Sequence, residues 1–258
     1  MQKKVQTSWG TVAGWYDEML QDEKSFQKNV IAPNLLRLMS IKKGDHILDL
    51  ACGTGFFSNI FFEAGGCVSG VDIGHELIEI ARKNSPTQIE YTVSSADKIP
   101  QIKTESMDTV AIILAIQNIE NVSGVFKEVK RVLKRDGTLY VVLNHPNYRI
   151  PKSSEWGYDE EKNIQFRRID RYLSESKIKI DMHPGEKNSD TTLSFHRPLQ
   201  YYFKQLAKNN LCVTRLEEWI SHRVGPKGKR FVASEQARKE IPLFLCLEIQ
   251  KIESSSHA

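Results

Sequence analysis

The sequence predicts an α/β fold in which a seven-stranded, mostly parallel sheet carries helices on both faces. Apolar strand segments alternate with amphipathic helical segments from residue 46 to residue 144. A loop of small residues follows the first strand, and the second strand ends in a carboxylate. With 258 residues, 40% of them hydrophobic and 26% charged, the chain can bury a large core in one domain.

The first strand is predicted at 46–50, where HILDL leads into the small-residue loop 51–55 and a helix over 56–64. Gly65 and Gly66 are a normal helix stop. The pattern then predicts, in order, a strand over 67–72, a helix over 75–84, a strand over 89–93, the polar loop 94–100 and a strand over 108–115.

The next helix is predicted over 121–137, and we expect Gly137 to end it before a strand over 138–144. Its apolar residues share one helical face: Val122, Val125, Phe126, Val129, Val132 and Leu133. Further along, the sequence predicts a helix over 198–210 and two closing strands, 212–220 and 242–251, joined by the basic linker 222–230.

Residues 145–197 differ from the rest because they are polar and lack a clear period. We interpret them as an inserted cap rather than another βαβ unit. The domain is therefore divided into an N-terminal segment, a core, a cap and a C-terminal helix with closing strands, and the tail SSSHA is expected to be disordered. The four parts span 1–44, 45–144, 145–197 and 198–252.

Charge and cysteine content indicate an ordinary cytoplasmic protein. The formal net charge is +4, and the four cysteines have neither CxxC nor metal-ligand spacing, so we expect reduced thiols and no metal site. MQKKVQTSWG lacks the apolar run of a signal peptide, and no window reaches the 18 or so apolar residues of a membrane span. We expect no membrane span and either a monomer or a homodimer.

The loop 51–55 and Asp72 together predict a nucleoside site. Glycines let a ligand approach the backbone, and a carboxylate after the second strand can accept both hydroxyls of a ribose. A dinucleotide fits less well, because Ser58 stands where the third glycine of G-x-G-x-x-G belongs and Asp49 would repel a pyrophosphate. Asp49 suits a ligand with a positive charge and an amine.

At these residues the chain resembles the class I S-adenosylmethionine-dependent methyltransferases. The matching motifs are DLACGTG at 49–55, GVD at 70–72, SAD at 95–97, the strand 108–115 and LNHP at 143–146. More closely, the chain is similar to a bacterial group of the methyltransferase type 11 kind, through NHP at 144–146, FHRPL at 195–199 and the N-terminal residues Trp9, Ala13, Tyr16 and Asp17. Ala51 stands in place of the first glycine of the usual D-x-G-x-G-x-G pattern.

The resemblance implies a Rossmann-like fold with S-adenosylmethionine as methyl donor and S-adenosylhomocysteine as product. It places Asp49 near the methionine amine, Asp72 on the ribose hydroxyls and Ile73 on the adenine. The other implied cofactor residues are Ala51, Gly53 and Gly55 along the cofactor backbone, Ala96 and Asp97 at the adenine amino edge, Ala115 to Gln117 at the methionine end, and Tyr16 in an N-terminal lid (1–44).

The methyl group of the cofactor is already activated, so a base is needed only for an acceptor that arrives protonated. His145, after the fifth strand, and His196, at the exit of the cap, are the candidate catalytic residues. An arginine there could anchor a carboxylate or phosphate of the acceptor. The polar cap candidates are Arg149, Arg168, Asp170, Tyr172 and Arg197. Each of these residues also has a purely structural interpretation. The histidines could simply end a strand, the arginines could form a solvated face, and Trp9, Trp15 and Tyr16 could be a packed hydrophobic cluster.

The function that these residues favour is methyl transfer to a small-molecule acceptor enclosed by the cap. The alternative is an RNA or protein methyltransferase that uses the linker 222–230 as its contact, although AIQN at 115–118 replaces the N/D-P-P-Y/F loop of the best-known amine-methylating route. We therefore do not expect nucleic acid as a partner. Association with nucleic acid that weakens steeply as salt is added would favour the alternative. A cofactor-binding protein without catalysis is a third reading, which cofactor binding without turnover would support.

Overall fold

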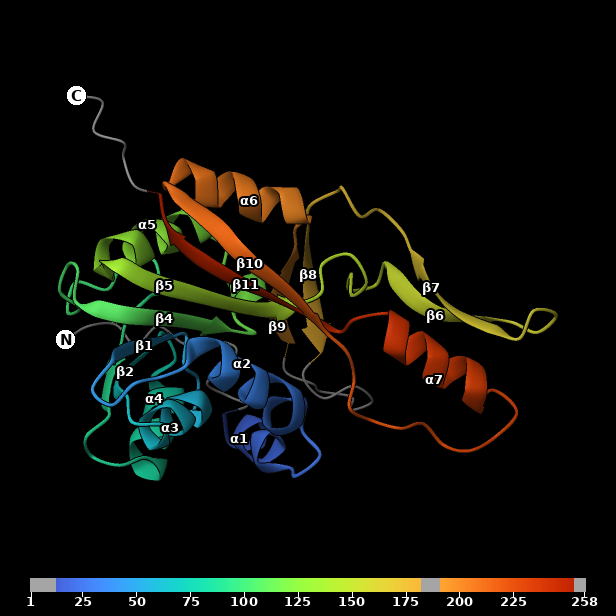
Figure 1. The fold of residues 1–258 in the computed structure, drawn as a ribbon, viewed down its shortest axis with the longest axis horizontal. Coiled ribbons are helices and arrows are strands. Elements are labelled where there is room, and N and C mark those ends of the chain that lie inside the picture. The colour runs from blue at the N-terminus through green and yellow to red at the C-terminus, as the bar shows by residue number, and fades with distance from the viewer. Residues whose placement is uncertain (1–12, 182–190, 253–258) are drawn as a thin grey trace.

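The computed structural model of the chain describes residues 13–181 and 191–252. Its centre is a seven-stranded sheet of order β10-β11-β5-β4-β1-β2-β3 (Figure 1). Strands β1 to β5 are parallel to their neighbours, whereas β11 runs antiparallel to both β5 and β10. The seven strands are β1 (His46–Leu50), β2 (Cys67–Asp72), β3 (Glu90–Val93), β4 (Met107–Ile113), β5 (Leu133–Asn144), β10 (Leu211–Trp219) and β11 (Phe244–Lys251). This confirms the predicted seven-stranded, mostly parallel sheet.

The order of the strands creates a crevice beside β1. From β1 the chain moves outward through α3 (Phe56–Glu63), β2 and α4 (His75–Asn84) to β3, and then returns to place β4 on the other side of β1. Ile47 is accordingly opposite Val68 of β2 and Thr109 of β4. In open parallel sheets, ligands bind at the carboxyl ends of strands where the direction of winding reverses.

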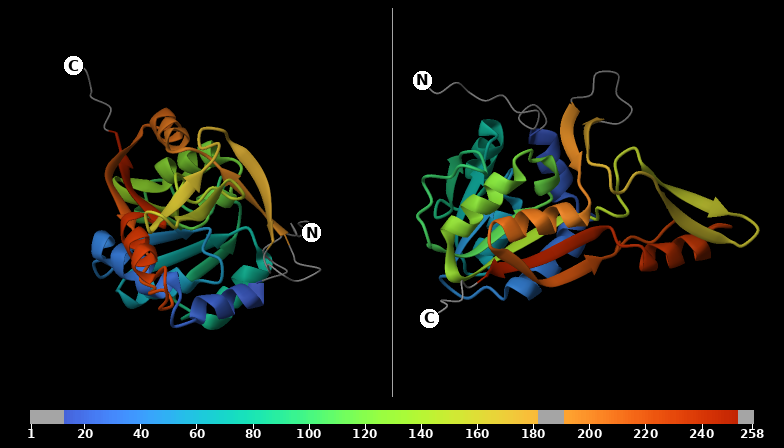
Figure 2. Two further views of the ribbon diagram at one scale, coloured as in Figure 1. Left: turned by 90° about the vertical axis from the view of Figure 1, so that its right-hand side faces the viewer. Right: turned by 90° about the horizontal axis from the view of Figure 1, so that it is seen from above.

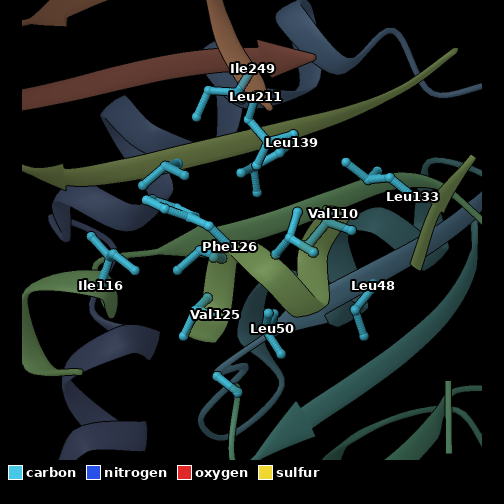
Figure 3. Close-up of a cluster of buried hydrophobic side chains, with 14 of the residues drawn as sticks. Leu48, Leu50, Val110, Ile116, Val125, Phe126, Leu133, Leu139, Leu211 and Ile249 are labelled. Carbon is cyan, nitrogen blue, oxygen red and sulfur yellow. The ribbon is translucent and has the colours of Figure 1, made fainter. Parts of the chain in front are cut away.

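Alternating side chains of the central strands form two cores, one on each face of the sheet. Leu48 and Leu50 belong to the core beneath α5 (Val122–Val132) and α6 (Leu199–Lys208), which Figure 3 shows. Ile47 points to the opposite core, beneath α2 (Ala32–Met39), α3 and α4. Figures 1 and 2 show the two helical layers. Because a strand with both faces covered is apolar throughout, these strands give near-continuous hydrophobic runs in the sequence.

The helix α5 ends at Val132, five residues before the predicted end at Gly137. Leu133 is already extended and pairs with Met107, so its burial comes from the sheet and not from the helical face. Gly137 lies in an irregular segment of β5, where a Cβ would come within 2.9 Å of the Met107 carbonyl oxygen. The helix was predicted too long because Leu133 happens to continue the apolar period of the helix. In the structure it belongs to β5, although it packs in the same core as the apolar face of α5.

The N-terminal segment packs as helices beside the sheet. It contains α1 (Ala13–Gln21), a short π-helix, η1 (Gln27–Ile31), and α2. Asn84 donates a hydrogen bond to Asp17 at 3.1 Å, which ties α1 to the end of α4. Trp9 and the tail SSSHA lie outside the described residues. In the described part of the chain, no helix is both long and apolar enough to cross a membrane.

The cap contains two antiparallel hairpins. One pairs β6 (Ser154–Asp159) with β7 (Ile164–Ile169), and the other pairs β8 (Ser176–Asp181) with β9 (Thr191–His196). The prediction that this segment is not a βαβ unit is confirmed, but the reading that it lacks a period is wrong. In β8, half-buried Ile178 and Ile180 alternate with exposed Lys177 and Lys179, and this period of two passes unnoticed because half of the strand is charged.

One helix, α7 (Phe231–Glu240), was not predicted at all. It follows the linker 222–230 and packs beside β7, and together with the β6–β7 hairpin it extends away from the central sheet (Figures 1 and 2). In this helix Ala233 and Ala237 are the buried residues. Two alanines give almost no hydrophobic periodicity, so the sequence alone carries little signal for this helix.

Candidate functional site

The loop after β1 turns back over the end of β2. The backbone N–H groups of Ala51 and Cys52 donate to the Val71 carbonyl oxygen at 2.7 and 3.0 Å, and Ala51 has a left-handed φ of 63°. Gly55 has φ 81°, and a Cβ there would collide with the hydroxyl of Tyr91 and lie 3.2 Å from the Cβ of Ala81. Gly55 is therefore required for packing behind the loop, whereas the sequence pattern assigned it to the approach of a ligand.

A cleft of about 820 Å³ opens at the carboxyl ends of β1, β2 and β4. It continues into a second lobe of about 690 Å³, with which it shares Ala51, Asp72, Ile73, Asn118 and Ile119. Most of the predicted cofactor residues meet in these two lobes: Asp49, Ala51, Gly53, Asp72, Ile73, Ala96, Asp97 and Ala115. Tyr16 lies in α1, which supplies Leu20 to the wall of the cleft.

Asp72 is held rigidly at the end of β2. It is 8% exposed, and its Oδ1 and Oδ2 accept hydrogen bonds from the N–H groups of Gly74 at 2.8 Å and Gly53 at 3.0 Å. Burial raises the pKa of Asp72, while these N–H groups act in the opposite direction. Each carboxylate oxygen accepts more than one hydrogen bond, so both retain capacity for a ligand hydroxyl.

Asp49 is the more deeply buried carboxylate of the cleft, with 2% of its surface exposed. Burial raises its pKa to about 7, and the nearby charge of Asp72 adds to the rise. Ser58 donates from its hydroxyl to Asp49 Oδ2 at 2.6 Å, which explains a serine where a dinucleotide site needs a third glycine. No lysine, arginine or histidine lines either lobe of the cleft among the described residues. Two buried carboxylates without a cation therefore fit a positively charged ligand.

Asp97 orders the loop at the second lobe. Its Oδ1 accepts from the Ser95 hydroxyl and its Oδ2 accepts from the Asn121 amide at 2.7 Å. The Ser95 hydrogen bond is the main reason why the pKa of Asp97 is lowered. Asn121 also caps α5 by accepting from the N–H of Gly124 at 3.0 Å. Asp97 thus joins the rim of the cleft to the start of α5.

Comparison with known proteins agrees with this geometry. Residues 48–141 match the family model for a methyltransferase domain. The fold superimposes on an S-adenosylmethionine-dependent methyltransferase from Mesorhizobium loti with a TM-score of 0.69 and 25% identity, covering 87% of this chain and 99% of that one. This chain is a class I S-adenosylmethionine-dependent methyltransferase. The resemblance in the sequence is confirmed, and the cofactor is S-adenosylmethionine.

Two curated relatives cover most of the methyltransferase chain. A ubiquinone/menaquinone biosynthesis C-methyltransferase from Hydrogenovibrio crunogenus is 28% identical over 72% of this chain and 78% of its own length. An uncharacterized protein from Haemophilus influenzae is 24% identical over 78% of this chain and 79% of its own length.

A separate cavity of about 400 Å³, here named the cap cavity, lies between the end of β5 and the β8–β9 hairpin. Its lining residues are Gln117, Leu143, Asn144, Pro146, Arg149, Pro151, Ile180, Ser194, Phe195, His196, Arg197 and Tyr202. The 3₁₀ turn η2 (Ile116–Asn118) divides this cavity from the cofactor cleft, because Ala115 and Asn118 line the cleft and Gln117 lines the cavity. Gln117 was predicted at the methionine end of the cofactor and instead faces the cap.

Gln117, a lining residue of the cap cavity, has an amide oxygen without a hydrogen-bond partner among the described residues. Its amide nitrogen donates to the Leu114 carbonyl oxygen at 2.7 Å. Its Oε1 is buried and has no hydrogen-bond partner in the described part of the chain. A buried amide oxygen without a partner is costly, so a ligand N–H or O–H group would stabilise it.

The structure separates the two candidate catalytic histidines. Nε2 of His196 lies 2.7 Å from the Tyr172 carbonyl oxygen, so this nitrogen carries the proton and Nδ1 can accept one. His145 is 1% exposed and is not among the residues that line the cleft or the cap cavity. Nε2 of its ring contacts Glu218 at 2.7 Å, and Nδ1 accepts from the N–H of Asn147 at 3.3 Å. Burial lowers the pKa of His145. These contacts favour a structural role for His145, and its catalytic role stays a prediction.

The cap arginines named from the sequence also differ from one another. Arg168 already pairs with Glu155 at 2.9 Å and Asp170 at 3.1 Å. Arg197 is 4% exposed and donates from Nη1 and Nη2 to the carbonyl oxygens of Ile119 and Glu120, both at 2.9 Å. Because Ile119 lines the cofactor cleft, Arg197 fastens the cap hairpin to the wall of that cleft.

Several cleft residues gave no distinguishable signal in the sequence. They are Leu20, Phe56, Phe57, Leu77, Asn118 and Ile119. The apolar ones are indistinguishable from core residues, since a helix or strand that borders a cleft uses the same apolar periodicity as one that borders the core.

Proposed function

We propose that this methyltransferase transfers the methyl group to a small-molecule acceptor held in the cap cavity. The observation that carries the proposal is the position of this cavity, which adjoins the cofactor cleft across the single turn η2 and is lined in part by the β8–β9 hairpin. The named activity of the Hydrogenovibrio relative, in quinone biosynthesis, also favours a small-molecule acceptor.

The cofactor roles follow from the contacts of the cleft. Asp72 would accept the ribose hydroxyls through the lone pairs that Gly53 and Gly74 leave available. Asp49 would receive the methionine amine and lose its proton as it does so. Ile73 is exposed between the two lobes, where an adenine ring can pack on it.

The sulfonium of the bound cofactor supplies a methyl group that is already activated. The residues of the cap cavity therefore have to align the acceptor and exclude water. Gln117 Oε1 would orient an N–H or O–H group of the acceptor. Nδ1 of His196 would take the proton of an acceptor that arrives protonated, because Nε2 is already committed to Tyr172.

The test is transfer of a labelled methyl group from S-adenosylmethionine into cell extract. We expect label in the low-mass fraction, insensitive to ribonuclease and protease, and no label with Asp72→Ala. Label confined to ribonuclease-sensitive or protease-sensitive material of high mass would overturn the proposal and support the RNA or protein alternative. Cofactor binding by calorimetry without any label would support a binding protein without catalysis.

A further inference from the structure

A third cavity, of about 380 Å³, lies beside the cap cavity and is cationic. It is lined by Tyr148, Arg149, Trp156, Arg167, Ile241, Pro242 and Leu243. Two arginines and no acidic residue are therefore found among its lining residues in the described part of the chain. We name it the arginine cavity. Its charge is opposite to that of the cofactor cleft, where Asp49 and Asp72 are among the lining residues.

Arg167 is held in a fixed orientation at this cavity. Its Nε donates to the Tyr148 carbonyl oxygen at 2.8 Å, and its Nη2 donates to Ser154 Oγ at 2.8 Å. The guanidinium also lies over the ring of Trp156, 5.3 Å from its centroid. The charge of Glu155 acts on Arg167, but the ion pair of Glu155 is with Arg168. Arg167 is thus pre-oriented and its positive charge is not paired with a carboxylate.

The side chain of Arg149 has no hydrogen bond or ion pair with any residue that the structure describes, although its backbone N–H donates to the His145 carbonyl oxygen at 2.9 Å. It is accessible to solvent, yet enough protein surrounds it that desolvation lowers its pKa, and the charge of Arg167 lowers it further. Two guanidinium groups that repel one another without an acid between them are costly unless an anion joins them. Arg149 also lines the cap cavity, so it is the residue that the two cavities share.

We infer that Arg149 and Arg167 form a binding site for an oxyanion, a carboxylate or a phosphate, carried by the methyl acceptor. The inference rests on the proposed function, since it assigns the acceptor an anionic group that reaches from the cap cavity into the arginine cavity. A guanidinium can hold either group through two parallel N–H donors, and this geometry selects anions over neutral polar groups. The site would fix one end of the acceptor while Gln117 and His196 meet the other.

The test uses inorganic phosphate and acetate as probes on the full-length protein, with chloride at the same ionic strength as reference. We expect phosphate or acetate to raise the unfolding temperature of the wild type above the chloride value. The preferred probe then distinguishes a phosphate from a carboxylate site. Arg149→Gln should weaken binding of that probe at least about tenfold, the loss of a charge-assisted bidentate contact. Arg149→Lys should retain part of the affinity, because it keeps the charge but not the paired donors.

The matched control is Arg168→Gln, an exposed arginine nearby on β7 that already has acidic partners. It should bind the probe like the wild type. Because the guanidinium of Arg149 makes no hydrogen bond or ion pair with a described residue, Arg149→Gln should unfold at an unchanged or higher temperature without the probe. Equal stabilisation by phosphate, acetate and chloride, or equal probe binding by wild type and Arg149→Gln, would overturn the inference.

Calorimetry with S-adenosylmethionine separates this inference from the proposed function. Arg149→Gln should bind the cofactor within about twofold of the wild type, the scatter expected for a site that it does not touch. A large loss of cofactor affinity in this variant would overturn the assignment of Arg149 to the acceptor. The labelling experiment with extracts tests the small-molecule acceptor itself, whatever the outcome with the anion probes.

Discussion

The cofactor cleft and the cap cavity lie on two sides of one short turn, η2, but they are built in different ways. The polar groups of the cleft that would bind the donor, from Asp49 to Asp97, come from a single continuous part of the chain. The cap cavity is assembled from β5, the cap and α6, with Gln117, Arg149 and Tyr202 far apart in the sequence. The cleft presents carboxylates, whereas the cap side presents arginines and a histidine.

This difference separates the two substrates of the reaction. A local motif with fixed backbone geometry suits a donor that is the same for every member of the class. Side chains gathered from distant segments can change one at a time, so the acceptor site can vary while the donor site stays intact. Four predictions test this division, beginning with the largest expected effect.

Asp72→Ala should greatly weaken binding of the methyl donor and leave the fold in place. Loss of charge-assisted hydrogen bonds to two hydroxyls should weaken S-adenosylmethionine binding by at least about 100-fold, measured by calorimetry. Asp108→Ala is the control, because Asp108 lies at the opposite end of β4 and bonds to His46 and Lys134 outside the cleft. Unchanged cofactor affinity in Asp72→Ala would contradict the cofactor assignment of this cleft.

Arg197→Met should weaken the attachment of the cap hairpin to the wall of the cofactor cleft. The variant keeps the apolar stem of the side chain and removes its hydrogen bonds to the carbonyl oxygens of Ile119 and Glu120. We expect a loss of about 2–3 kcal/mol in the free energy of unfolding, from denaturant titration. Cofactor affinity should fall several-fold, because Ile119 lines the cleft. A variant as stable as the wild type would show that the cap hairpin is held without this residue.

The raised pKa of Asp49 should make cofactor binding in the cleft depend on pH, whereas no such dependence is expected from this group in the cap cavity. With its pKa raised from 3.8 to about 7, the folded protein holds a proton that the unfolded chain releases, so this group's contribution to stability is present below pH 4 and lost as the pH rises through 7. A cationic ligand favours the ionised form. Cofactor affinity should therefore rise by up to about tenfold per pH unit between pH 5.5 and 7.

Asp49→Asn is the control for this pH dependence. It should bind the cofactor weakly and show a flat profile over the same range, while the wild type releases a proton on binding, detected by calorimetry in buffers of different ionisation enthalpy. A wild-type profile as flat as that of Asp49→Asn would show that Asp49 is already ionised before the cofactor arrives.

Ala51→Gly should have the smallest effect and the opposite sign. Ala51 adopts φ 63°, which costs an alanine about 1–2 kcal/mol and would cost a glycine little. Part of this gain is cancelled, because glycine also makes the unfolded chain more flexible and so more stable. We expect the free energy of unfolding to rise by less than about 1 kcal/mol. Ala64→Gly, at φ −73° on the exposed end of α3, should instead lower it. Equal losses in both variants would mean that the backbone at Ala51 is unstrained.

The errors of sequence interpretation follow the same division. Asp49, Asp72 and Asp97, which the sequence assigns to one cofactor site, line the two lobes of one cleft, since a strand that ends at a loop fixes where its next side chains lie. Their cofactor roles stay predictions. His145 and His196 looked equivalent in the sequence, and only the contacts of Glu218, Asn147 and Tyr172 distinguish them. The pairing of Arg149 with Arg167 depends on the β6–β7 hairpin, whose half-buried and exposed strands gave no clear hydrophobic pattern in the sequence.

The sequence by itself determined the sheet, its winding and the methyl donor, because apolar periodicity and a backbone-bound motif act over short stretches of chain. The tertiary structure decided that Gly55 packs against Tyr91, that Leu133 belongs to a strand, that Gln117 faces the cap, and that two arginines share a cavity. These are contacts between segments far apart in the chain. Such contacts depend on how the layers pack, and no local pattern in the sequence encodes them.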